Sequence, residues 1–123
     1  MNIVDSSGWL EFFADETNAD FFVEPITKTD ELLVPTINIF EVFKRIIQQR
    51  NQGDALQAVA VMRQGKVINL DDTLALQAAK FGHEFKLPLA DSIIFATARA
   101  HGATLWTQDA DFQSLEGVRY IKK

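Results

Sequence analysis

The chain has 123 residues, of which 47% are hydrophobic and ten are Phe, and its 12 basic and 17 acidic residues leave a formal net charge of −5. This length and composition predict one well-cored globular domain over residues 1–123 and exclude a disordered chain. The absence of cysteine excludes disulfides, thiolate zinc sites and a cysteine nucleophile. The chain has no signal-peptide pattern, and no uncharged apolar stretch approaches the ~18 residues that span a bilayer, so we expect a cytoplasmic protein with no membrane partner.

Short apolar runs alternate with helical patterns along the chain. In chain order, the predicted elements are a strand at 2–5, a broken helix from residue 9 to beyond 22, a strand at 31–34, helices at 37–50 and 54–64, a strand at 66–70, helices at 72–85 and 89–101, and strands at 104–107 and 118–121. Ser6-Ser7-Gly8 predicts a turn, Asp54 and Asp71 are expected N-caps, and Gly102 is expected to stop the helix before it.

This alternation predicts an α/β fold with a central parallel sheet of four to five short strands and helices on both faces. The crossovers should be right-handed, whereas the order of the strands does not follow from the pattern. In open parallel sheets, binding sites form outside the carboxyl ends of the strands.

Four acidic residues stand at the ends of otherwise apolar elements. Asp5 and Asp109 directly follow predicted strands, and Glu41 lies one turn into the helix after the second strand. We expect these three to converge at the carboxyl edge of the sheet. Asp91 opens a later helix and is placed less directly, because consecutive helices follow the third strand.

Each acid also has a purely structural interpretation when it is taken singly. Asp5 can cap the first helix, and Asp91 complements the dipole of its own helix. Glu41 lies four residues before Arg45, and an exposed ion pair at this spacing contributes only ~0.3–0.5 kcal/mol. Asp109 and the neighbouring Asp111 suit an Asx turn. The order of these acids along the chain and their placement at the ends of elements together favour a shared site.

Carboxylates that converge need a cation. Two like charges 4 Å apart repel by ~4 kcal/mol at an effective dielectric of about 20. Mg²⁺ and Mn²⁺ favour oxygen ligands, and one or two such ions can activate water and stabilise a leaving oxygen in phosphodiester hydrolysis. The acids named above account for the net charge of −5, so the charge argues only weakly against a nucleic-acid substrate. The two histidines lack HExxH spacing, and no Gly-rich phosphate loop follows the first strand.

Several sequence blocks carry a family resemblance. They are Asp5-Ser6 after the first strand, Val34-Pro35-Thr36 leading to Glu41, the segment from Leu87 to Ala98 around Asp91, Gly102-Ala103-Thr104-Leu105, and the segment from Thr107 to Phe112. With these blocks, nearly the whole chain resembles a PIN domain, and most closely the short VapC-type toxin ribonucleases.

The resemblance implies an endoribonuclease that depends on Mg²⁺ or Mn²⁺, with one or two ions. The family's acidic positions, both catalytic and metal-binding, match Asp5, Glu41, Asp91 and Asp109. Asp111 matches a further acid found in many members, and Ser6 and Thr107 match hydroxyl positions that support the site. The resemblance also implies an RNA substrate, a homodimer and inhibition by a cognate antitoxin. Which RNA is cut, how many ions act and whether Asp109 or Asp111 is the ligand stay open.

Three other functions remain as alternatives. A catalytically silent PIN fold could serve as a binding module. A receiver domain would use the acidic pair Asp71-Asp72 and the late Lys122, but the order of these features along the chain is inverted. An aspartyl phosphatase usually has a second acid two residues after the first, and here that residue is Ser7.

The first half of the chain is rich in large apolar residues, which either complete the core or form a groove for an antitoxin helix or a dimer face. They are Trp9, Phe12, Phe13, Phe21, Phe22, Phe40, Phe43 and Ile47.

Overall fold

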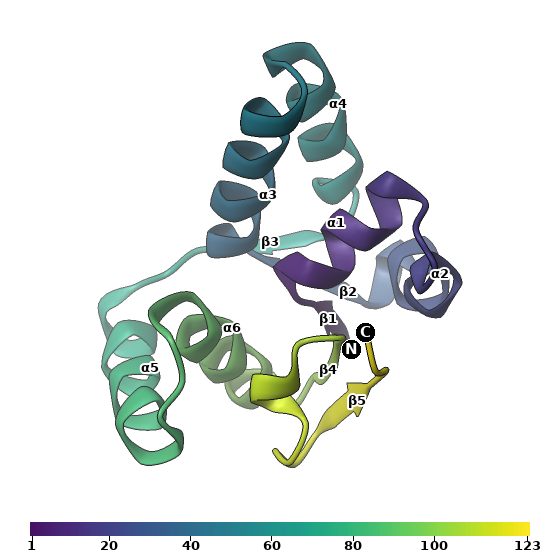
Figure 1. Ribbon diagram of the computed structural model, residues 1–123. Coiled ribbons are helices and arrows are strands. Elements are labelled where there is room, and N and C mark those ends of the chain that lie inside the picture. Colours follow the sequence, from purple (N-terminus) through teal and green to yellow (C-terminus); the bar gives the residue numbers. More distant parts are fainter.

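The computed structural model describes all 123 residues and contains a five-stranded sheet (Figure 1). In chain order the elements are β1 (Asn2–Val4), α1 (Ser6–Ala14), α2 (Ala19–Thr27), the 3₁₀ turn η1 (Thr29–Glu31), β2 (Leu32–Pro35), α3 (Thr36–Gln49), α4 (Gln52–Met62), β3 (Lys66–Ile68), α5 (Asp72–Phe85), α6 (Leu89–Ala100), β4 (Thr104–Thr107), η2 (Ala110–Phe112) and β5 (Val118–Tyr120). The strands lie in the order β3-β2-β1-β4-β5, and every neighbouring pair is parallel. The predicted fold class is therefore confirmed. No helix is long and apolar enough to cross a membrane.

The two faces of the sheet bury different side chains, because successive residues of a strand point to opposite faces. Val4 and Trp106 belong to a cluster with residues of α1, α2, α3 and α4. Ile3 and Leu105, each one position earlier, pack with residues of α6 in a second cluster, against which side chains of α5 also pack. Figure 1 shows α1 and α2 on one side of the strands and α5 with α6 on the other. Helices thus cover both faces, as predicted.

Capping residues set the start of several helices. Helix α1 begins at Ser6 because the Asp5 carboxylate accepts the Gly8 N–H at 2.9 Å, so the predicted turn at Ser6–Gly8 is in fact the first helical turn. For α4 the cap is Asn51, whose Oδ1 accepts the Asp54 N–H at 2.8 Å; the prediction of Asp54 as the cap was wrong by one turn. The prediction for α5 is confirmed, since Asp71 accepts the Leu74 N–H at 2.8 Å.

Gly8 lies where α1 passes closely over the strands and α2. A Cβ at this position would come within 2.5 Å of Phe22 Cε1 and 2.7 Å of Val4 Cγ1. Any larger residue would force α1 or the side chains of Phe22 and Val4 to shift.

The direction in which the chain adds strands reverses beside β1. From β1 the chain adds β2 and then β3 on one side, and then crosses to add β4 and β5 on the other. In open α/β sheets such a switch point, outside the carboxyl ends of the strands, is where ligands bind. Here it lies between the ends of β1 and β4, which are followed by Asp5 and Asp109.

Candidate metal centre

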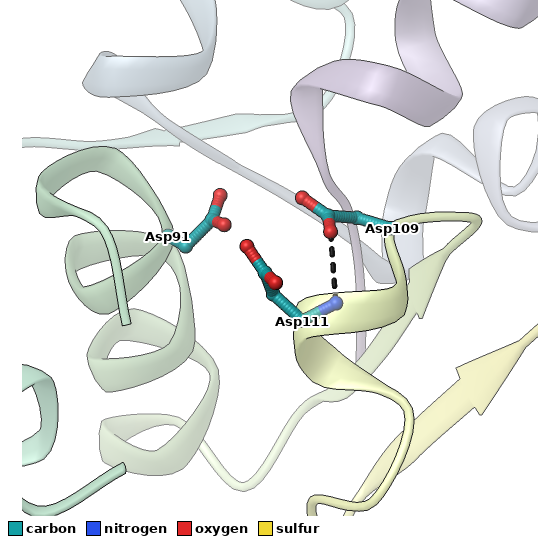
Figure 2. Close-up of side chains that lie close together, drawn as sticks. All are labelled: Asp91, Asp109 and Asp111. Atoms are coloured by element: carbon teal, nitrogen blue, oxygen red, sulfur yellow. Dashed lines mark hydrogen bonds between the residues drawn. The ribbon is translucent and has the colours of Figure 1, made fainter. Parts of the chain in front are cut away.

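Three carboxylates meet at the switch point (Figure 2). Asp91 comes from the first turn of α6, Asp109 lies two residues after the end of β4, and Asp111 belongs to η2. One oxygen of each carboxylate lies within 4.8 Å of one oxygen of each of the others. The Asp111 N–H also donates to Asp109 Oδ1 at 2.9 Å. The Asx turn considered for Asp109 and Asp111 therefore exists, and it brings both side chains beside Asp91.

Asp5 is held rigidly next to this group. It is only 2% exposed, and its carboxylate accepts the Gly8 N–H, the Ser7 hydroxyl at 2.8 Å and the Thr107 hydroxyl at 2.6 Å. Three donors use three of about four acceptor positions of a carboxylate, so one position remains for a further partner. Asp5 is both the cap of α1 and a charged group with a free acceptor position.

The pKa values reflect the burial of these acids and their mutual repulsion. Burial raises the pKa of Asp5 from 3.8 to about 6, although its hydrogen bonds from Thr107, Gly8 and Ser7 oppose the rise and repulsion by Asp109 adds to it. The pKa of Asp91 is also raised, first by burial, then by repulsion from Asp109 and by its hydrogen bond with Asp109, with smaller contributions from Asp5 and Asp111. Neither of the two ion pairs of the molecule involves any of these residues.

Glu41 stands apart from the group of three carboxylates and is joined to the site through Ser6. The Ser6 hydroxyl donates to Glu41 Oε1 at 2.6 Å and accepts Asn38 Nδ2 at 2.9 Å. The ion pair with Arg45 that its spacing allowed is not formed. The structure thus brings Asp5, Asp91 and Asp109 into mutual electrostatic contact, and it ties Glu41 to the residue after Asp5.

Two residues that contact the site were not singled out from the sequence. Ser7 donates to Asp5, whereas Ser6, which was singled out, serves Glu41. Asn38 is completely buried, and its Oδ1 has no hydrogen-bond partner. It shares the buried stripe of α3 with Val42 and Ile46, so a polar residue on an apolar helical stripe was the available signal.

The donor set fits a hard divalent cation. Three carboxylates supply oxygen ligands within a small volume and carry charge that no basic side chain neutralises. Oxygen ligands of this kind suit Mg²⁺ and Mn²⁺ and do not suit softer metals. Burial is the main cause of the raised pKa of Asp91, and repulsion from Asp109 adds to it; a bound cation would relieve that repulsion.

A protein-family model for the PIN domain matches residues 3–118. The chain belongs to the PIN-domain family. The predicted family is thereby confirmed, and the acids described above stand on the scaffold of a PIN domain.

Solved structures of similar fold include toxins. A toxin–antitoxin complex from Klebsiella pneumoniae matches with a TM-score of 0.82 and 22% identity, over 97% of this chain and 96% of that chain. VapC20 from Mycobacterium tuberculosis, described as a toxin that cleaves the sarcin-ricin loop, matches with a TM-score of 0.77 and 18% identity, over 94% and 95%. DNA-bound VapBC from Salmonella typhimurium matches with a TM-score of 0.75 and 14% identity, over 99% and 98%. A search of curated proteins found no match.

Proposed function

We propose that this PIN domain is a metal-dependent endoribonuclease and the toxin of a type II toxin–antitoxin pair. The observation that carries the proposal is the meeting of Asp91, Asp109 and Asp111 at the switch point of the sheet without a neutralising base. The PIN family and the fold similarity to toxins, one of which cleaves the sarcin-ricin loop, support it.

In this proposal Asp5, Glu41, Asp91 and Asp109 hold one or two Mg²⁺ or Mn²⁺ ions. Such an ion supplies an acidified water and neutralises charge on the phosphate. Asp111 adds a carboxylate beside Asp91 and Asp109, so it serves as an additional ligand or as a hydrogen-bond acceptor for bound water.

The hydroxyl side chains orient the acids. Thr107 and Ser7 fix the Asp5 carboxylate, and the Thr107 hydroxyl also accepts the Asp109 N–H at 2.9 Å. Thr107 therefore connects the acids that follow β1 and β4. Ser6 holds Glu41 in the same way, with Asn38 behind it.

The alternatives fit the structure less well. Receiver domains have the strand order 2-1-3-4-5, whereas this sheet has β3-β2-β1-β4-β5. Asp71 caps α5 and is not part of the group of acids. Ser7, at the place of a phosphatase's second acid, donates a hydrogen bond to Asp5. A catalytically silent PIN fold remains as the competing proposal, because it would bind the cation without cutting RNA.

The decisive experiment maps RNA cleavage ends after incubation with the purified protein in Mn²⁺. Wild type is expected to produce defined ends, and Asp5→Asn to lose them. The matched control is Asp20→Asn, which removes an exposed acid of α2 that is not part of the group of acids. Cleavage that survives in Asp5→Asn would refute the proposal, and cation binding without any cleavage would favour the silent binding module.

We also propose an antitoxin partner that occupies a groove between α1, α3 and α4. A cavity of about 320 Å³ lies there, with an apolar lining from Leu10, Phe13, Ile46, Ala58 and Val61. The Arg50–Asp54 ion pair, at 2.9 Å, stands on its rim. An amphipathic helix suits an apolar groove with a polar rim.

Of the large apolar residues of the first half, Trp9 and Phe22 are core residues, whereas Phe40 is 59% and Ile47 41% exposed. Phe40 and Ile47 lie seven residues apart on α3 and therefore share one face, which we propose as part of a homodimer contact.

The partner proposal is tested with the cognate antitoxin that it requires, sought among the products of the genes next to that of this chain. Val61→Glu is expected to weaken its binding at least tenfold, while Leu76→Glu, at a position 69% exposed on α5, should leave it unchanged. If the partner inserts an Arg among the carboxylates, raising Mn²⁺ should weaken its inhibition; inhibition independent of Mn²⁺ would leave occlusion of the groove as the mechanism.

A further inference from the structure

A second cavity, of about 400 Å³, opens beside the acids and shares Asp109 with them. Its volume lies in the range of small-ligand pockets, about 300–1,000 Å³. The polar and aromatic residues that line it are Ser7, Gln108, Asp109, Tyr120, Lys122 and Lys123. The cavity combines an aromatic ring and two ammonium groups next to a site proposed to hold a cation.

Gln108 gives the cavity a fixed polar wall. It is 4% exposed, its Nε2 donates to Glu11 Oε1 at 3.1 Å, and its Oε1 accepts Asn18 Nδ2 at 3.0 Å. Both ends of the amide are satisfied within the protein, so this wall is formed before any ligand arrives. The same amide ties the end of β4 to α1 and to the start of α2.

The segment that carries the two lysines is attached to the acidic site. The Ile121 N–H donates to the Thr107 carbonyl at 3.0 Å, and Asn18 Nδ2 donates to the Lys122 carbonyl at 3.2 Å. Thr107 is the residue whose hydroxyl holds Asp5. Lys122 and Lys123 therefore project from a backbone whose position is coupled to that of the acids, and neither forms an ion pair.

The two lysines of the cavity favour an anionic ligand. With a formal net charge of −5, the protein as a whole does not attract a polyanion. Attraction must come from local positive groups, and Lys122 and Lys123 supply them beside Asp109. A positively charged groove with an aromatic side chain is the arrangement that binds single-stranded nucleic acid, because phosphates meet the cations and a base stacks on the ring.

We infer that this cavity binds the nucleotide adjacent to the phosphate received by the acidic site, in a single-stranded RNA, with Tyr120 against the base and Lys122 and Lys123 against the backbone. The inference rests on the proposed nuclease function for the identity of its ligand. The cavity binds and orients the RNA strand, and its residues take no part in the cleavage step itself.

Binding is measured separately from cleavage. The probe is a fluorescein-labelled ten-nucleotide oligouridylate, titrated by fluorescence anisotropy in Ca²⁺ at several salt concentrations, with the probe checked for cleavage on a gel. For single strands each phosphate contact contributes about 0.7 to the slope of log K against log[salt]. Lys122→Gln combined with Lys123→Gln should therefore reduce the slope by about 1.4. The matched control combines Lys66→Gln and Lys80→Gln, at exposed positions on β3 and α5.

Tyr120 is tested by the loss of its ring. Tyr120→Ala should lower the affinity for the same probe about tenfold, a typical effect of losing one stacked base, without changing the salt slope. Tyr120→Phe keeps the ring and should bind the probe as wild type does. The unchanged salt slope of Tyr120→Ala separates the loss of stacking from a structural change in β5 that displaces Lys122 and Lys123. A parallel titration with oligodeoxyuridylate shows whether the cavity prefers the ribose.

The inference is overturned if wild type binds no oligonucleotide, or if the lysine and Tyr120 variants bind as wild type does. Failure of the nuclease proposal gives a different result, because wild type would then bind through the cavity while no ends appear in the cleavage experiment. The reverse result, cleavage by wild type with unchanged binding in all cavity variants, would reject the role of the cavity and support the nuclease proposal.

Discussion

Replacing Asp5 by Asn is expected to remove a pH dependence of stability that is unusual for a carboxylate. Burial raises the pKa of Asp5 from 3.8 to about 6 in the folded, metal-free protein. The folded state therefore binds this proton more tightly than the unfolded state. Between pH ~4 and ~6 the unfolded chain is ionised at Asp5 while the folded protein still holds the proton, so stability falls as pH rises. Most acids, whose pKa is lowered by folding, behave in the opposite way.

The magnitude follows from the size of the rise. At about 1.4 kcal/mol per pKa unit, a change from 3.8 to about 6 corresponds to ~3 kcal/mol. The full difference should be present below pH ~4 and lost above pH ~6. Asp5 is 2% exposed, so solvent screens this effect very little.

Urea unfolding in EDTA, at several pH values from 4 to 7.5, measures the effect for wild type and Asp5→Asn. Asn keeps the volume and loses the titration, so the free energy of unfolding of wild type relative to the variant should fall by about 2.4 kcal/mol across this range, because part of the full difference is already lost at pH 4. Excess Mn²⁺ should raise the free energy of unfolding of wild type relative to the variant at pH 7.5, because a bound cation favours the ionised carboxylate. Two pH profiles that stay parallel within about 0.5 kcal/mol would refute the argument from burial.

The remaining predictions concern the other residues of the site. Mn²⁺ at about 100 times its Kd should stabilise wild type by ~2.7 kcal/mol, and Asp91→Asn should reduce the rise in melting temperature; an equal rise in both proteins would remove Asp91 from the site. Asp109→Asn should lower RNA cleavage at least a hundredfold while the far-ultraviolet circular dichroism is unchanged, and full activity of this variant would identify Asp111 as the ligand instead. Asn38→Leu should weaken Mn²⁺ binding measured by calorimetry, because Ser6 loses its fixed orientation toward Glu41; binding equal to that of wild type would show that Asn38 serves packing alone.

The elements were largely predictable from the sequence because they follow from local patterns. Short apolar runs in β1, β2 and β4 reflect strands that are buried on both faces, and the helical periodicity of α3 reflects burial that repeats about every 3.6 residues. The order β3-β2-β1-β4-β5 was not predictable, since it depends on contacts between distant segments that no local pattern encodes. The cap of α4 was misplaced because both Asn51 and Asp54 are good caps, and only the backbone shows which one accepts the N–H.

The acids of the site could be proposed from their positions, whereas the groups that hold them could not be assigned correctly. Asp5 is followed by two serines, and the sequence does not say that Ser7 turns back to Asp5 while Ser6 reaches Glu41 on α3. That division depends on the helical twist of the first turn of α1, which was predicted as a turn outside the helix. The role of Asn38 could not be assigned either, because it depends on the packing of one face of α3 against Ser6.

The double role of Asp5 gives this protein a spectroscopic probe of its own site. The Gly8 N–H donates to Asp5 Oδ1 at 2.9 Å, and no other residue fits at position 8 beside Phe22. The nitrogen resonances of glycine amides stand apart in a two-dimensional NMR spectrum, and the Gly8 N–H reports the electron density on a single carboxylate oxygen. Protonation of Asp5, arrival of a cation and displacement of that cation by a partner would each move this one cross-peak, so all three events can be followed without a label at the site.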